Sequence, residues 1–302
     1  MYILLEYGCK GAQAVLIDRL FFLIRPADEA SSAMAAWLIS WSVKQRYLDR
    51  DVSGALASLD TAEAILRAKK LDQSLDRSNL CYRKAVCFLD LGWSAEAAPL
   101  LRECLSILSA HGGADSTPNM MTTRNTYAVA LQISGQSEAA LREYQALTAL
   151  YREQERQHSA QYAVLQNNIA VLLDQSGRYE EAAQAIRTVL DIDGNQLPPP
   201  DVSSTHLRNA ALIFAHLQQY DAAEPLAESA CELRRKHFGE DSPWTADAKA
   251  VHALALFYLG QQKKAALMIE EACKTLENAW GREHRHTVNA LQIKSVVRSD
   301  AR

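Results

Sequence analysis

The side chains in this chain that could do chemistry are histidines, paired carboxylates and cysteines. His284 and His286 are two residues apart, and Glu180–Glu181 and Glu270–Glu271 are adjacent pairs. A zinc site would need further ligands at suitable spacing, and covalent catalysis would need a nucleophile beside a base. Neither accompanies these residues, and no phosphate-binding loop, nucleophile elbow or H-E-x-x-H motif occurs. We therefore expect no enzyme, no metal and no cofactor, with the two histidines solvated in a loop.

The cysteines favour the same conclusion. None belongs to a C-x-x-C pair, and most fall at apolar positions of helical stretches, where a free thiol acts as a small hydrophobe. They are Cys9, Cys81, Cys87, Cys104, Cys231 and Cys273. We expect a reduced, cytoplasmic setting without disulfides. The net charge of -4 and the lack of like-charge blocks predict neither nucleic acid nor a membrane as partner.

Several polar residues could bind rather than react. Asn125, Asn167, Asn168 and Asn209 fall in predicted helix interiors, although Asn is a poor helix former. An Asn amide offers a donor and an acceptor to an extended peptide backbone, and an Arg can grip a carboxylate with two donors. The alternatives to ligand contact are a solvated inner face and hydrogen bonds between neighbouring helices.

An internal repeat predicts the elements that position these residues. A Gly or a polar turn residue is followed five positions later by an Ala, and this Ala recurs every 41–43 residues at Ala55, Ala97, Ala140, Ala182, Ala223 and Ala265. A second small or apolar residue lies seven positions after each Ala, and a third lies twelve positions before it. Seven residues are two helical turns, so the pattern predicts pairs of closely packed antiparallel helices joined by short turns.

The framework Gly-x-x-x-x-Ala-x-x-x-x-x-x-Ala resembles the tetratricopeptide repeat, whereas the period alone would also suit HEAT or armadillo repeats. The connections His237–Thr245 and Trp280–Thr287 resemble the Gly-x-x-His-Pro-x-Thr loop of the longer subtype of kinesin light chains and bacterial signalling proteins. Arg285 stands where that subtype has Pro. The resemblance implies an all-α fold, a right-handed solenoid of antiparallel helix pairs.

The register predicts a single solenoid over residues 1–302. It would consist of an N-terminal half-repeat over 1–30, six helix pairs over 31–286 and a capping helix over 287–302. One segment breaks the pattern. Asp191–Ser204 contains three consecutive prolines and is expected to interrupt the helices as an exposed connector, or to act as a proline-rich docking segment.

By the same resemblance, the first helix of each pair lines a concave groove. The residues expected to contact a partner there are Tyr82, Arg83, Asn125, Asn167, Asn168, Arg208 and Asn209. The resemblance favours a non-enzymatic scaffold or adaptor for an extended peptide segment, acidic or with a free C-terminal carboxylate. The alternative is the regulatory or sensor portion of a larger signalling protein, such as a kinase or transcription regulator. An enzyme ranks third and would require a buried cluster of ionisable residues.

Overall fold

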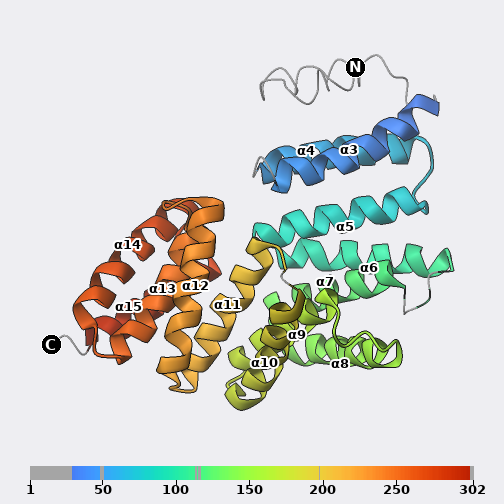
Figure 1. Ribbon diagram of the computed structural model, residues 1–302. Helices are drawn as coiled ribbons and strands as arrows, with labels where there is room; N and C mark the ends of the chain where they lie inside the picture. The colour runs from blue at the N-terminus through green and yellow to red at the C-terminus, as the bar shows by residue number, and fades with distance from the viewer. Residues whose placement is uncertain (1–28, 48–50, 113, 115–116, 197, 300–302) are drawn as a thin grey trace. The chain divides into compact units, whose positions relative to one another are not determined.

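The computed structural model describes residues 29–47, 51–112, 114, 117–196 and 198–299. Within these residues every regular element is an α-helix, and no strand is present (Figure 1). The expected fold class, an all-α helical repeat, is confirmed. The half-repeat expected over residues 1–30 lies almost wholly outside the described residues.

The chain divides into two compact units, residues 1–136 and 137–302. The described helices of the first unit are α3 (Glu29–Tyr47), α4 (Val52–Ala68), α5 (Leu75–Asp90), α6 (Ser94–Ala110) and α7 (Pro118–Ile133). Those of the second unit are α8 (Ser137–Glu153), α9 (Ala160–Gln175), α10 (Tyr179–Gln196), α11 (Pro200–His216), α12 (Tyr220–Phe238), α13 (Pro243–Tyr258), α14 (Gln262–Trp280) and α15 (Arg285–Ser299). A single solenoid through both units stays a prediction.

Within each unit, consecutive helices pack as pairs: α3 with α4, α5 with α6, α9 with α10, α11 with α12, and α13 with α14. The turn inside a pair is short because a residue with positive φ ends the first helix. Gly92 has φ of 79°, and the next amide, Trp93 N, donates to Phe88 O at 2.8 Å. This is the Schellman arrangement that glycine favours. Gln218 takes the same role at φ 60° in the α11–α12 turn.

The small residues of the repeat lie where the helices touch. Ala97, Ala182, Ala223 and Ala265 are all fully buried. Ala85 and Ala97, twelve residues apart on α5 and α6, belong to one core cluster. A larger side chain at these positions would push the paired helices apart, because helix axes separated by 8–10 Å leave room only for small side chains at the contact.

The loop between α12 and α13 caps both helices. Gly239 ends α12 at φ 91°, and its N–H donates to Arg235 O. Ser242 precedes α13, and its hydroxyl accepts a hydrogen bond from Trp244 N at 3.3 Å. Pro243 occupies the first helical position, where its missing N–H is not needed. This loop therefore fixes the start of α13.

The expected helix break across Asp191–Ser204 is present but much shorter than that segment. Helix α10 continues to Gln196, and α11 already begins at Pro200, so only residues 197–199 separate the two helices. No proline lies within α10, so no backbone N–H is missing from its last turns. Pro200 is tolerated at the start of α11 because proline suits the first helical turn. The predicted docking segment therefore reduces to three residues.

Candidate recognition face on the first helices

The residues predicted to contact a partner are divided between the two units. In the first unit, Tyr82 and Arg83 lie on α5 and Asn125 lies on α7. Thr126 Oγ1 on α7 donates to Tyr82 Oη at 3.4 Å, and the Arg83 guanidinium lies 5.6 Å from the centre of the Tyr82 ring. The first helices α5 and α7 are thus joined through polar side chains on this face.

In the second unit, Asn167 and Asn168 lie on α9, and Arg208 and Asn209 lie on α11. Asn209 Nδ2 donates to Asn167 Oδ1 at 3.0 Å across the two helices. Asn168 and Asn209 are half-buried, whereas Asn167 is buried with 6 % of its surface exposed. We call Asn167, Asn168 and Asn209 the asparagine row. Hydrogen bonding between neighbouring helices, one alternative to ligand contact, thus occurs within the row.

Arg208 differs from the expectation. It is 6 % exposed, and its Nη2 donates to Asp247 Oδ1 on α13 at 2.8 Å. Its Nη1 donates to Asn209 Oδ1 at 3.2 Å. The guanidinium was expected to face a ligand carboxylate, but an internal carboxylate already occupies it. Sequence register placed Arg208 on the correct helix and could not reveal a partner 39 residues away.

Asp247 is the centre of a buried ionic cluster that the sequence analysis missed. Besides Arg208, it accepts a hydrogen bond from Arg234 Nη1 on α12 at 2.7 Å and one from His286 Nδ1 on α15 at 3.0 Å. Arg234 Nη1 also donates to Trp244 O at 2.8 Å. Asp247 is 1 % exposed and Arg234 is 2 % exposed. We call Asp247, Arg208, Arg234 and His286 the Asp247 cluster, and it joins α11, α12, α13 and α15.

The charges of the cluster follow from its surroundings. Burial by itself would raise the pKa of Asp247, but Arg208, His286 and Arg234 outweigh it and hold that pKa well below its ordinary value. Burial lowers the pKa of His286 despite the opposing effect of Asp247. At neutral pH the carboxylate is charged and the imidazole is neutral, so Nδ1 of His286 carries the proton that it donates.

The expectation that both C-terminal histidines are solvated in a loop is wrong, since His284 is half-buried in the loop just before α15 and His286 lies within that helix. His284 and His286 stack with their ring centroids 5.4 Å apart, and Trp280 lies 4.6 Å from His284 and 5.5 Å from His286. The ring centroid of Trp244 lies 5.9 Å from that of His286, so Trp244 belongs to the same aromatic group. Burial against these rings lowers the pKa of His284 to about 4. Both histidines are shielded from water because they pack against aromatic rings at the start of α15, and the helix register of the sequence does not reveal this packing.

A buried cluster of ionisable residues was the one feature that would favour an enzyme, and its geometry argues against that use. The side chains of Asp247, Arg208 and Arg234 are 1–8 % exposed and bond one another, so no substrate reaches the carboxylate. Among the described residues, no group of three or more His, Cys, Asp or Glu could hold a metal ion. No helix in the described part of the chain is long and apolar enough to cross a membrane.

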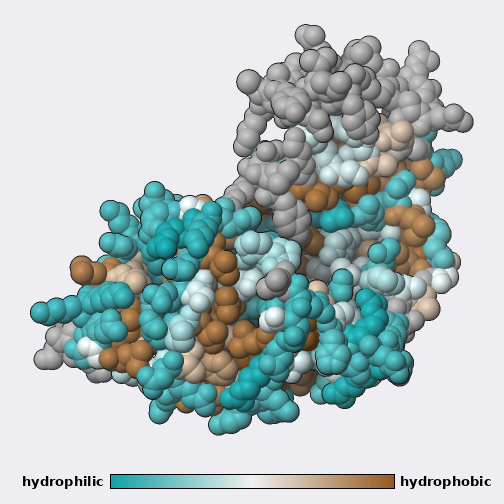
Figure 2. Space-filling view, viewed as in Figure 1, coloured by the Kyte–Doolittle hydropathy of each residue, from teal (hydrophilic) through white to brown (hydrophobic). Residues whose placement is uncertain are grey.

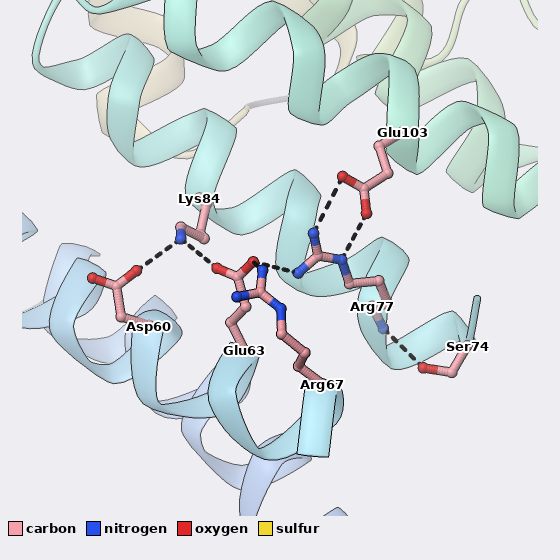
Figure 3. A network of polar contacts seen from close by, with 7 residues as sticks. All are labelled: Asp60, Glu63, Arg67, Ser74, Arg77, Lys84 and Glu103. Atoms are coloured by element: carbon pink, nitrogen blue, oxygen red, sulfur yellow. Dashed lines mark hydrogen bonds and ion pairs between the residues drawn. The ribbon is translucent and has the colours of Figure 1, made fainter. Parts of the chain in front are cut away.

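The first unit has its own ionic network, which is shown in Figure 3. Arg77 on α5 donates to Glu103 on α6 from Nε at 2.7 Å and from Nη2 at 3.2 Å, and to Glu63 on α4 from Nη1 at 2.7 Å. Lys84 bonds Glu63 and Asp60 at 2.7 Å. Burial would raise the pKa of Glu63, but hydrogen bonds from Lys84 and Arg77 lower it to about 2. The network ties three successive helices together.

A pocket of about 570 Å³ lies between the α8–α9 connection and the end of α10. Tyr162 and Ile192 line it together with polar residues such as Arg152 and Asp191. None of the predicted contact residues lines this pocket. Figure 2 shows hydrophilic side chains over most of the visible described surface, with hydrophobic side chains in bands between them.

Two segments match models of the tetratricopeptide repeat, residues 163–196 and residues 201–278. They contain the asparagine row, Arg208, Arg234 and Asp247. No curated protein matches the sequence of the chain.

Solved structures share the fold at low sequence identity. TPR-like repeats from Podosopora anserina, described as those of a kinesin light chain, have a TM-score of 0.52 and 19 % identity over 67 % of this chain and 96 % of theirs. A Rap protein complexed with Competence and Sporulation Factor has a TM-score of 0.64 and 11 % identity over 95 % of this chain and 80 % of its own. NprR in complex with its cognate peptide NprX has a TM-score of 0.63 and 14 % identity over 96 % of this chain and 79 % of its own. Residues 163–196 and 201–278 therefore contain tetratricopeptide repeats, and the solved structures show that the chain shares their all-α repeat fold.

Proposed function

We propose that this chain is a non-catalytic scaffold that binds an extended peptide segment of another protein along its first helices. The observation that carries the proposal is the asparagine row. Asn168 on α9 and Asn209 on α11 are half-buried side chains on neighbouring first helices. Asn209 bonds Asn167, the residue next to Asn168 in the sequence. Amides in such a row suit the backbone of an extended peptide, which repeats its own donors and acceptors.

The similar structures support a peptide ligand. Both the Rap protein and NprR are seen with a bound partner, Competence and Sporulation Factor and the peptide NprX, and each shares the fold over nearly all of this chain. Tyr82, Arg83 and Asn125 stay part of the proposal as residues that would contact a peptide within the first unit. A partner that is acidic or ends in a free carboxylate, and a cytoplasmic location, remain parts of the proposal. The five described cysteines are free, which fits a reducing compartment.

The experiment is a selection of peptides by the purified chain from a random library of extended peptides with free C-termini. The selected peptides should bind the parent chain in solution. Substitution of Asn168→Ala together with Asn209→Ala should weaken binding. Asn278→Ala is the matched control, since Asn278 is an exposed amide on the second helix α14. A library that yields no binding peptide would contradict the proposal, as would equal weakening by the control.

A further inference from the structure

We infer that the Asp247 cluster gives the asparagine row a fixed direction, so that the row offers N–H donors and recognises carbonyl or carboxylate oxygens of the peptide. Arg208 would be the positioning residue that transmits this direction. The inference rests on the proposed function and names the chemistry that the face would recognise.

The direction follows from the chemistry of the side chains. An arginine has five N–H donors and no acceptor, so only the oxygen of Asn209 can face Arg208 Nη1. The amide nitrogen of Asn209 must then lie on the opposite side, where it donates to Asn167 Oδ1. Turning the Asn209 amide over would place an N–H against the guanidinium and an oxygen against Asn167. The usual ambiguity of an amide side chain is therefore removed here.

Counting donors and acceptors shows what the side chains of Asn167 and Asn209 have left. The Oδ1 atoms of Asn209 and Asn167 each accept a bond, from Arg208 and from Asn209 respectively. The described residues give no partner to the Asn167 amide nitrogen and no second partner to the Asn209 amide nitrogen. Each amide oxygen accepts one of the two bonds it can accept, so on Asn167 and Asn209 the hydrogens left for a ligand outnumber the oxygen lone pairs. An oxygen of the peptide satisfies these hydrogens, whereas a peptide N–H can pair only with the remaining lone pairs.

Asp247 fixes the start of this chain of bonds. Arg208 Nη2 donates to Asp247 Oδ1, which also accepts a hydrogen bond from His286 Nδ1. Arg234 Nη1 donates to the other carboxylate oxygen, Oδ2. Two guanidinium groups share one carboxylate, and His286 is neutral, so the cluster keeps one positive charge in excess. The Nε atoms of Arg208 and Arg234 are buried without a hydrogen-bond partner among the described residues. An excess positive charge behind the row also favours a ligand that brings oxygen atoms with negative charge.

Two substitutions separate positioning from simple stability. Arg208→Met removes the donor that orients Asn209 and leaves Asp247 with Arg234 and His286. Arg234→Met removes the other guanidinium from Asp247 and leaves Arg208 on Asn209, so it is the matched control. Both variants lose one buried charged hydrogen-bonding group, and only the first should alter the row.

The first measurement needs no ligand. The side-chain amide signals of Asn209 and Asn167 are recorded by nuclear magnetic resonance in the full chain labelled with ¹⁵N-asparagine. Arg208→Met should shift both sets of signals and speed their hydrogen exchange, while Arg234→Met should leave them close to those of the parent. Unchanged Asn209 signals in Arg208→Met would overturn the inference.

The second measurement uses a peptide from the library selection. Arg208→Met should weaken its binding about two- to twelve-fold, the range for loss of one neutral hydrogen bond, and Arg234→Met should not. Asn209→Asp keeps an oxygen towards Arg208 but removes the donors, so it should weaken binding as much as Asn209→Ala. Undiminished binding by Asn209→Asp would overturn the donor direction while leaving the proposed function intact. If the parent binds no peptide, the proposed function fails, and the amide signals still decide the positioning.

Discussion

Asn209 Nδ2 donates to Asn167 Oδ1 at 3.0 Å, and the two residues are 42 positions apart in the sequence. That separation is one residue more than the repeat spacing at this point, which is 41 from Ala182 to Ala223, so nearly equivalent positions of the first helices α9 and α11 contact each other. An asparagine inside a helix costs stability because its amide competes for the backbone. The bond between the two amides offsets part of this cost, so the residues contribute to helix packing in addition to the recognition that we propose for them.

Asp247→Asn should destabilise the second unit by about 3–5 kcal/mol, because it leaves two buried guanidinium groups without a counter-charge. Chemical denaturation followed by circular dichroism measures the loss. Asp241→Asn is the control, since Asp241 is exposed in the loop before α13, and it should change stability by less than about 0.5 kcal/mol. Similar effects of the two substitutions would show that the Asp247 cluster contributes little.

The stability of the second unit should fall as the pH drops from about 6.5 to 4. Burial, His286 and Arg285 lower the pKa of His284 to about 4, whereas an unfolded histidine titrates near 6.5. Between these values the unfolded chain binds more protons, so protonation favours unfolding, and the contribution is fully present only above the unfolded pKa. Hydrogen exchange of the α15 amides measures this loss.

The substitution His284→Phe tests whether His284 causes this pH dependence of stability. It retains ring packing against Trp280 and removes both the titration and a buried Nδ1 that has no hydrogen-bond partner among the described residues. We expect a smaller pH dependence and a gain of roughly 1 kcal/mol at pH 7, at the lower end of the cost of an unpaired buried polar group. His158→Phe, at an exposed position of the same unit, should leave the pH dependence as in the parent. An unchanged slope in His284→Phe would refute the assignment.

In the first unit, Arg77→Lys should cost about 1.5–3 kcal/mol, the value of hydrogen bonds to charged groups. Arg77 bonds Glu63 and Glu103 from three different nitrogens, which one ammonium group cannot reproduce. Arg67→Lys is the matched control, because Arg67 also bonds Glu63 but its side chain is 69 % exposed. That control should cost less than about 0.5 kcal/mol. Thermal unfolding of both variants would distinguish a structural network from a surface ion pair.

Much of the fold could be predicted from the sequence because local rules and the repeat agree. Small residues twelve positions apart mark the contact inside each pair, and glycines with positive φ, such as Gly92, end the first helices. The error at Asp191–Ser204 arose from treating the prolines as a break of several turns. Pro200 instead begins α11, where proline fits.

The site was predictable only in part. The repeat placed Asn168 and Asn209 at equivalent points of neighbouring helices, whereas the amide that Asn209 contacts is that of the adjacent residue, Asn167. The partner of Arg208 could not be predicted, because Asp247 lies on another helix pair and no periodic signal marks it. One sequence feature could have raised the question, namely a lone carboxylate in a helix that is otherwise largely apolar. Asp247 is the only acidic residue in α13, Pro243–Tyr258, whose residues are mostly buried.

The central claim is that the asparagine row contacts a peptide, and the affinity of one selected peptide tests it most directly. Isothermal titration compares the parent chain with the variant that combines Asn168→Ala and Asn209→Ala. Two lost hydrogen bonds should weaken binding by roughly one to two decades, with an unchanged helical signal in circular dichroism. Equal affinities of the parent and the variant for that peptide would contradict the claim, and the row would then serve only to join the first helices.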